Sequence, residues 1–245
     1  MNAQEALEFP MKLNFISALL LSVGAVTQFQ TAVFAQATSA LEAQPPAVNP
    51  NKTHAEVLVE HRECQRCELS GLKLNNANLR GAVIDHIDLR RSDLSGSNLS
   101  FSSIYYGDFR SADLRNTDFR HSFLIFADLL RANLEGVNAR NSRWRYADLT
   151  ESILRNANLN EIELVNAKLV SADLRNTSLR HASLYRADLR NADLRRADLY
   201  RADLREANIT GANFTDANLC HATMPDGTIS TQGCFLPRPV VQSAN

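Results

Sequence analysis

The chain has 245 residues, 44% of them hydrophobic, and its 26 Lys and Arg residues nearly balance its 27 Asp and Glu residues, for a formal net charge of −1. This balance excludes a chain that is strongly acidic or strongly basic as a whole. The sequence contains no nucleophile-elbow motif, no glycine-rich phosphate loop and no His, Asp and Glu cluster at metal-ligand spacing. We therefore expect no enzyme activity, no cofactor and no metal.

The first 37 residues resemble a secretory signal peptide with a short N-terminal extension. Lys12 precedes an apolar run over residues 13–26, and small residues follow, so that cleavage after Ala35 or Ala37 fits. The apolar run is too short and too mixed for a membrane span, although an uncleaved anchor is the alternative. We expect export to the periplasm, the cell exterior or a thylakoid lumen, with no stable membrane span after cleavage.

Residues 38–52 and 53–66 predict a linker and an N-terminal cap. The first segment carries several prolines without an apolar period, which is typical of a mobile linker. In the second, Thr53 resembles a helix N-cap with Glu56 three residues later. We expect a short helix between residues 54 and 63 that covers the end of the following segment with its apolar residues, Ala55, Val57, Leu58 and Val59.

Residues 67–224 form a repeat with a period of five. From Leu69 to Met224 a large apolar residue returns at every fifth position, 32 positions in all, and only Ala139 breaks the rule. A small residue usually lies two positions earlier, and Asp or Asn usually lies between. Neither a helix of 3.6 residues per turn nor a strand of period two explains this spacing, so the chain must turn within each repeat.

Segments such as Ala187-Asp188-Leu189 resemble the A(D/N)LXX unit of the pentapeptide repeat family, from Cys67 to about Met224. The resemblance implies an all-β fold, a right-handed quadrilateral β-helix in which four pentapeptides make one square coil. The repeats then make about eight coils, stacked at about 4.8 Å in a rod of roughly 38 Å. We also expect the single Trp, Trp144, to fill the volume that Ala139 leaves empty.

The four cysteines lie in two pairs at opposite ends of the repeat. An even number of cysteines in an exported chain suggests disulfides, and the two pairs are too far apart to cross-link with each other. We predict a Cys220–Cys234 disulfide that holds residues 225–245 as a C-terminal cap or tail. Cys64 and Cys67 form a C-x-x-C that is either a disulfide or a pair of small core residues. A thioredoxin-like redox motif and a zinc site with His54 and His61 are the alternatives.

Three faces of the predicted rod carry alternating Asp or Asn and Arg, and we expect a solvated surface that compensates its own charge. A basic column that binds polyanions is the alternative. The fourth face is apolar, and Tyr106, Phe126 and Tyr146 should stack along one of its corners. Such patches mark partner surfaces or sites of self-association, end to end or side by side, and the alternative is that neighbouring side chains or the terminal segments cover this one. We call it the aromatic face, and its residues are Phe101, Tyr105, Tyr106, Phe123, Ile125, Phe126, Tyr146, Val165 and Tyr185.

These features predict a non-enzymatic scaffold that binds a protein partner, with no nucleic acid as a ligand. The alternative comes from the family resemblance, because some members mimic DNA, occupy the DNA site of DNA gyrase and confer fluoroquinolone resistance. Mimicry of DNA requires strong negative charge. Between Cys64 and Met224 the sequence has 22 Lys and Arg residues and 20 Asp and Glu residues, a balance of about +2. The charge and the signal segment both argue against mimicry.

Overall fold

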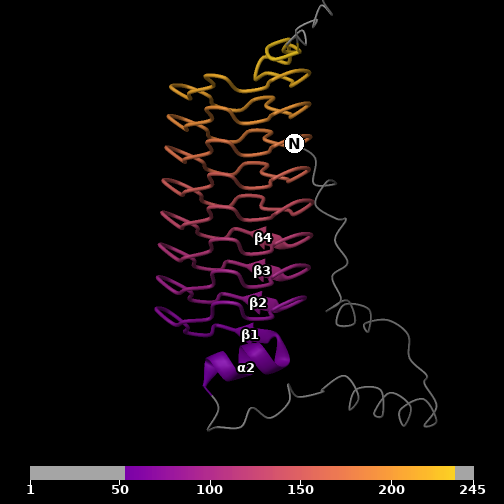
Figure 1. Ribbon diagram of the computed structural model, residues 1–245. Coiled ribbons are helices and arrows are strands. Elements are labelled where there is room, and N and C mark those ends of the chain that lie inside the picture. The colour runs from indigo at the N-terminus through magenta and orange to yellow at the C-terminus, as the bar shows by residue number, and fades with distance from the viewer. Residues whose placement is uncertain (1–52, 235–245) are drawn as a thin grey trace, which may run out of the picture. The chain divides into compact units, whose positions relative to one another are not determined.

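A computed structural model describes residues 53–234, which lie in one compact unit (Figure 1). Its elements are one helix and four short strands: α2 (His54–His61), β1 (Glu63–Gln65), β2 (Val83–Asp85), β3 (Ser103–Tyr105) and β4 (Phe123–Ile125). The predicted signal peptide over residues 1–37, the linker over 38–52 and the part of the predicted C-terminal cap or tail beyond residue 234 lie outside the described residues.

The coils stack through parallel pairing at a constant spacing of 20 residues. The strands form one parallel sheet in the order β1-β2-β3-β4, in which Cys64 pairs with Ile84 and Ile84 with Ile104. Isolated parallel bridges continue the same spacing as far as Asp203 and Thr223. Because 20 residues are four pentapeptides, one coil contains four repeats, as the sequence predicts. Figure 1 shows these coils stacked one on another.

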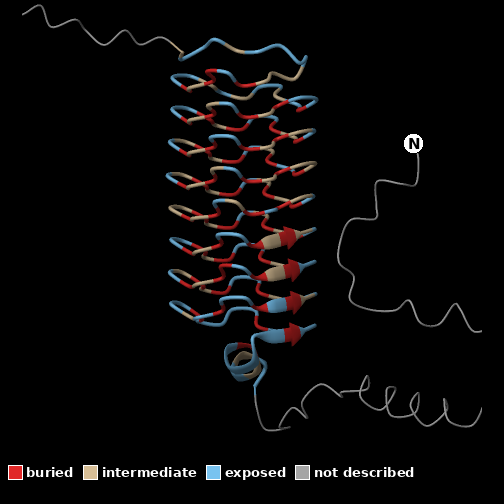
Figure 2. Ribbon diagram, turned by 90° about the vertical axis from the view of Figure 1, so that its right-hand side faces the viewer, coloured by how far each residue is buried: buried red, intermediate tan, exposed pale blue. Residues whose placement is uncertain are grey.

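The core is the column of side chains inside the coils. The central residue of every repeat from Leu69 to Leu204 is at most 8% exposed, and the small residues two positions earlier are mostly buried with it (Figure 2). Each buried Leu contributes about 1.5–3 kcal/mol before conformational entropy is subtracted. The period of five therefore exists because it returns one large and one small side chain to this interior in every repeat.

Trp144 is fully buried, as is Ala139. The indole meets the ring of Phe119 edge-on with centroids 5.4 Å apart, and its Nε1 donates a hydrogen bond to Ser122 Oγ at 3.4 Å. Phe119 lies 20 residues before Ala139, and so in the same column one coil away. This geometry supports the prediction that the indole fills the space beside Ala139.

Each repeat ends in a left-handed corner, two residues after the central one. The N–H of the next residue closes the turn, as from Ala82 to the carbonyl oxygen of Leu79 at 3.0 Å. The corner N–H groups pair with the following coil, as Tyr106 does with the carbonyl oxygen of Ile125 at 3.1 Å. Corner residues other than Gly have φ near +57°, a conformation that costs about 1–2 kcal/mol with a side chain. Pairing between coils offsets this strain.

Helix α2 begins with the predicted capping box. Glu56 N–H donates to Thr53 Oγ1, and Thr53 N–H donates to Glu56 Oε2 at 2.8 Å. Leu58 is fully buried and Ala55 packs beside it on the core, so the helix covers the first coil. The prediction that Val59 joins this cover is wrong, because Val59 is 46% exposed. Adjacent residues point about 100° apart on a helix, so one short helix cannot bury both.

At the other end, the chain after Met224 folds back over part of the last coil. Leu219 N–H donates to the carbonyl oxygen of Gln232, and His221 N–H donates to that of Ser230. Elsewhere on this end Ile209 and Phe214 are only partly buried. Within the described residues, no helix combines the length and hydropathy needed to cross a membrane.

Candidate partner surface and cysteine sites

Four corner residues of successive coils, His86, Tyr106, Phe126 and Tyr146, form a continuous stack that we call the aromatic ladder. Their ring centroids are 4.8, 5.1 and 4.9 Å apart, with interplanar angles of 22°, 5° and 17°. The stacking of Tyr106, Phe126 and Tyr146 is as predicted. These three residues are 50%, 45% and 49% exposed. Because the rings of Tyr106 and Phe126 are each stacked on both faces, they present their edges to solvent.

The other predicted residues of the aromatic face are not equally available. Tyr105 is 37% exposed, whereas the remaining strand and bridge positions are half-buried, namely Phe123, Ile125, Val165 and Tyr185. Phe101 occupies a different corner column, on the other side of strand β3. There His121 stacks on it at 4.8 Å and the Arg80 guanidinium lies 4.2 Å above its ring. Arg143 and Arg186 likewise lie over the rings of Phe123 and Tyr185, whereas the ladder offers its most exposed rings to solvent.

Ion pairs surround the half-buried part of the aromatic face. Glu163 accepts hydrogen bonds from Arg143 Nε at 2.9 Å and Arg145 Nε at 2.8 Å. Glu206 accepts hydrogen bonds from the Tyr185 hydroxyl at 2.7 Å and from Arg186 Nε at 2.6 Å.

These contacts shift the pKa values in directions that keep the groups in their usual states. The hydrogen bond to Glu206 raises the pKa of Tyr185, and Arg186 lowers the pKa of Glu206, so the phenol stays protonated and the carboxylate stays charged. Tyr185 and Glu206 border an open hollow that also includes Val165 and Ser183. Nothing in this arrangement activates a nucleophile or a general base.

The Asp and Asn residues of the repeat have a structural role that the sequence analysis did not identify. Their side-chain oxygens accept the backbone N–H two residues later, as Asp88 Oδ1 accepts Arg90 N–H at 3.0 Å and Asn98 Oδ1 accepts Ser100 N–H at 3.0 Å. The signal was the frequency of Asp and Asn before the central Leu, since these side chains readily accept nearby backbone N–H groups.

Where Asp precedes the central residue and Arg follows it, the guanidinium binds the same carboxylate through two nitrogens, in a pincer. In the pair of Asp113 and Arg115, Nε and a terminal nitrogen contact the carboxylate at 2.9 and 2.6 Å. Hydrogen bonding to Arg115 lowers the pKa of Asp113, and Asp188, Asp193 and Asp203 show the same effect with their own arginines. The predicted self-compensating surface is thus confirmed at the level of individual pairs.

The structure joins the cysteines as two disulfides, Cys64 with Cys67 and Cys220 with Cys234, with Cα atoms 5.8 and 4.7 Å apart. Among residues 53–234 the structure does not group His54 or His61 with Cys64 and Cys67 as possible metal ligands, and His54 Nδ1 instead accepts a hydrogen bond from the N–H of Glu68 at 3.2 Å.

A cluster that could hold a metal lies at the opposite end of the solenoid. Cys220, His221 and Cys234 bring their possible ligand atoms within 4.8 Å of one another. Among residues 53–234 it is the single group of three or more such side chains. The sequence offered one signal for it, the adjacency of His221 to Cys220. The approach of Cys234 depends on the fold of the non-repeating chain end.

Comparison with known proteins shows which family model the chain matches. The chain matches a family model described as pentapeptide repeats, in eight copies, over residues 63–100, 108–143, 132–169, 157–196 and 197–226. No curated protein matches the chain.

Several solved structures are similar to the chain. HetL, a pentapeptide repeat protein involved in heterocyst differentiation regulation from the cyanobacterium Nostoc sp. strain PCC 7120, is 29% identical, with a TM-score of 0.47 over 69% of this chain and 91% of its own. A trypsin-treated form of QnrB1, a plasmid-mediated fluoroquinolone resistance protein, is 19% identical, with a TM-score of 0.51 over 70% of this chain and 90% of its own. A pentapeptide repeat protein of the Arabidopsis thaliana thylakoid lumen is 31% identical, with a TM-score of 0.26 over 43% of this chain and 70% of its own.

At its level of identity, the likeness to QnrB1 concerns the fold alone, and it agrees with the expected right-handed quadrilateral β-helix. The family model covers more than half of the chain, over the same residues that carry the period of five and the coils of four repeats. The chain therefore belongs to the pentapeptide repeat family.

Proposed function

We propose that this protein is a non-enzymatic scaffold of an exported compartment that binds a protein partner through the aromatic face, with the aromatic ladder at its centre. The observation that carries the proposal is the exposure of three stacked rings at left-handed corners. Bulky residues are outliers in that conformation, whereas Gly and Asn adopt it readily. Strained positions that keep exposed aromatic side chains are typical of functional surfaces, and aromatic residues are the usual anchors of protein interfaces.

The export part of the proposal is supported by the signal-like pattern over residues 1–37 and by the pairing of all four cysteines. Stable disulfides are a property of oxidising compartments.

The alternative, DNA mimicry with gyrase as the target, has weaker support. The similarity to QnrB1 concerns the fold alone. Guanidinium groups bind many of the carboxylates of this rod directly, as Arg190 binds Asp188, and a paired carboxylate presents little net charge to a partner. The scaffold interpretation therefore explains more of the surface than the mimic does.

To test the partner surface, the parent and two corner variants are cross-linked in the native host, and the proteins that each of them captures are compared. In the triple variant Tyr106→Asn, Phe126→Asn and Tyr146→Asn, each ring is replaced by a residue that the same fold uses at other corners. The matched control is Ser111→Asn with Ser171→Asn, which introduces the same residue at two corners of another column. We expect a protein that the parent and the control capture and the triple variant loses.

Identical capture by all three proteins would refute the ladder as the partner surface. Sedimentation of the purified proteins distinguishes a foreign partner from a second copy of the chain. If the chain self-associates through the ladder, the parent and the control sediment as oligomers and only the triple variant sediments with the lower mass of a monomer.

Intact-mass measurement of the native protein after cell fractionation, without reductant, tests export separately. We expect a chain that begins at Gln36 or Thr38 and that is lighter by two hydrogens for each disulfide. A full-length, fully reduced protein in the cytoplasm would contradict the export proposal and restore the gyrase alternative.

A further inference from the structure

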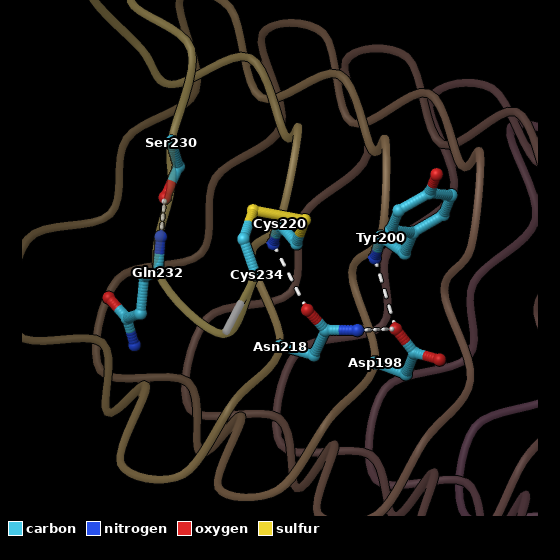
Figure 3. Close-up of a disulfide and its surroundings, with 7 residues drawn as sticks. All are labelled: Asp198, Tyr200, Asn218, Cys220, Ser230, Gln232 and Cys234. Atoms are coloured by element: carbon cyan, nitrogen blue, oxygen red, sulfur yellow. Dashed lines mark hydrogen bonds between the residues drawn. A yellow bond between two sulfur atoms is a disulfide. The ribbon is translucent and has the colours of Figure 1, made fainter. Parts of the chain in front are cut away.

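The C-terminal disulfide lies beside an exposed histidine in an arrangement that the partner-binding proposal does not use. Cys220 is 8% exposed, Cys234 is half-buried and His221 is exposed (Figure 3 shows the disulfide and its surroundings). The two sulfur atoms and an imidazole nitrogen lie within 4.8 Å of one another. Two thiolates and one imidazole are ligands that zinc prefers, at about 2.3 Å for sulfur and 2.0–2.1 Å for nitrogen.

Hydrogen bonds to their backbone groups fix the positions of Cys220 and His221 independently of the sulfur–sulfur bond. Asn218 Oδ1 accepts the N–H of Cys220 at 3.1 Å, and the carbonyl oxygen of Cys220 accepts the N–H of Arg201 at 3.0 Å (Figure 3 draws the first of these). His221 N–H donates to the carbonyl oxygen of Ser230 at 2.9 Å.

The chain that leads to Cys234 is held in the same way. Leu219 N–H donates to the carbonyl oxygen of Gln232 at 3.1 Å, and Cys234 N–H donates to that of Thr231 at 3.1 Å. Reduction of the disulfide would therefore leave all three side chains close together, as a preorganised binding site requires.

The His221 ring is also placed by a neighbour. It meets the ring of Tyr200 nearly perpendicularly, with centroids 5.8 Å apart and an angle of 79°. The disulfide of Cys64 and Cys67 lacks this third element, because the structure groups no histidine or carboxylate with it among residues 53–234. The two disulfides of the chain thus differ in what their reduction would create.

We propose that Cys220, His221 and Cys234 form a redox-dependent zinc site at the C-terminal end of the solenoid. A thiol reductant supplies two electrons and two protons to the disulfide, which becomes two thiols while the reductant becomes a disulfide. Zn²⁺ then displaces the two thiol protons to solvent, and the neutral imidazole donates a nitrogen lone pair. Water completes the tetrahedral coordination, as in other zinc sites with three protein ligands.

The test uses the full chain with Cys64→Ser and Cys67→Ser, so that one cysteine pair remains. Co²⁺ serves as the probe, because thiolate coordination gives a strong charge-transfer absorption. After reduction with a phosphine and its removal under exclusion of oxygen, we expect one equivalent of Co²⁺ to bind and Zn²⁺ to displace it. The oxidised protein should bind none.

The ligand role of the histidine is tested by His221→Ala against His181→Ala. His181 is a matched control, because it lies in the same corner column two coils away and meets the other side of Tyr200 edge-on at 5.8 Å. We expect His221→Ala to weaken Co²⁺ binding by at least about tenfold, the lower range for losses around metal sites, and His181→Ala to leave it unchanged.

The proposal fails if the reduced protein binds no Co²⁺ while its circular dichroism remains that of the oxidised protein, or if His221→Ala binds as tightly as the parent. If the serine variant does not fold, the native chain takes its place, with Cys220→Ser and Cys234→Ser as the comparison. Metal binding that persists in that comparison would overturn the assignment.

Discussion

Two corner columns of this solenoid share one backbone conformation and carry opposite kinds of side chain. The aromatic ladder stacks rings 4.8–5.1 Å apart. In another column Asn76 alternates with Gly96, and Asn116 with Gly136, at similar positive φ. There a Cβ on Gly96 would come within 2.5 Å of Asn76 Oδ1. One column is filled by its own polar side chains, and the other presents rings to solvent. The fold thus requires the left-handed corner but leaves its side chain open to selection for function.

The largest effect should come from the core that both columns share. We expect Trp144→Ala to lower the free energy of unfolding by about 3–5 kcal/mol, since it opens a cavity beside Ala139 and Phe119. Urea denaturation followed by circular dichroism measures the change. The control is Tyr146→Asn, two residues later at the corner. Equal losses in the two variants would show that the ladder is as much a part of the core as Trp144.

A β-branched residue in the column of Asn and Gly should lower the free energy of unfolding by less than Trp144→Ala does. We expect Gly136→Val to lower the unfolding free energy by about 2 kcal/mol, because it adds the strain of a left-handed β-branched residue and a clash with Asn116 Oδ1. The double variant with Asn116→Gly should recover the part that is due to the clash. If no part is recovered in thermal and urea unfolding, the tight contact in this column is not a source of the instability.

The ladder itself should matter little for stability. We expect Phe126→Asn to change the unfolding free energy by no more than about 1 kcal/mol. The loss of two stacking contacts, each about 0.5–1.5 kcal/mol, is offset by relief of an aromatic residue at a left-handed corner. A loss of 3 kcal/mol or more would assign the rings a structural role and weaken the case for a partner surface.

The smallest effect should come from an Asp and Arg pincer. Hydrogen bonding to Arg115 lowers the pKa of Asp113 in the folded state. The stabilisation is therefore fully present above the unfolded-state pKa of about 3.9 and is lost as the pH falls through the lower folded-state value. Asp113→Asn keeps an oxygen for the backbone N–H. We expect it to cost at most about 1 kcal/mol at neutral pH, less in high salt, and to reduce the acid dependence of stability.

Unfolding free energies measured between neutral pH and pH 2 test this directly. An unchanged acid slope in Asp113→Asn would mean that the pincer is too solvent-exposed to contribute.

Much of this structure follows from counting along the sequence. Positions that are multiples of 20 apart share a column, so the stacking of Tyr106 on Phe126 could be predicted before any coordinates. The capping box of α2 was equally readable, because it depends on two residues three apart. In each case the deciding interaction is local or is repeated by the period.

The features that could not be predicted from the spacing of residues depend on contacts that the repeat does not determine. The exposure of Val59 follows from the single face that a short helix can bury. The cover on Phe101 comes from the long Arg80 side chain of the neighbouring coil. The adjacency of Cys220 and His221 indicates only part of their cluster with Cys234, because the approach of Cys234 arises where the repeat stops and the chain folds back.

The unbroken register of the coils makes the chain a molecular ruler. Because each coil is the same length and contacts only its neighbours, the gain or loss of one coil's worth of coding sequence would lengthen or shorten the rod without disturbing any other coil. A change of any other size would rotate every later column away from its partners. The distance between the aromatic ladder and the cluster of Cys220, His221 and Cys234 can therefore evolve only in steps of one whole coil, which preserves the direction in which each site faces.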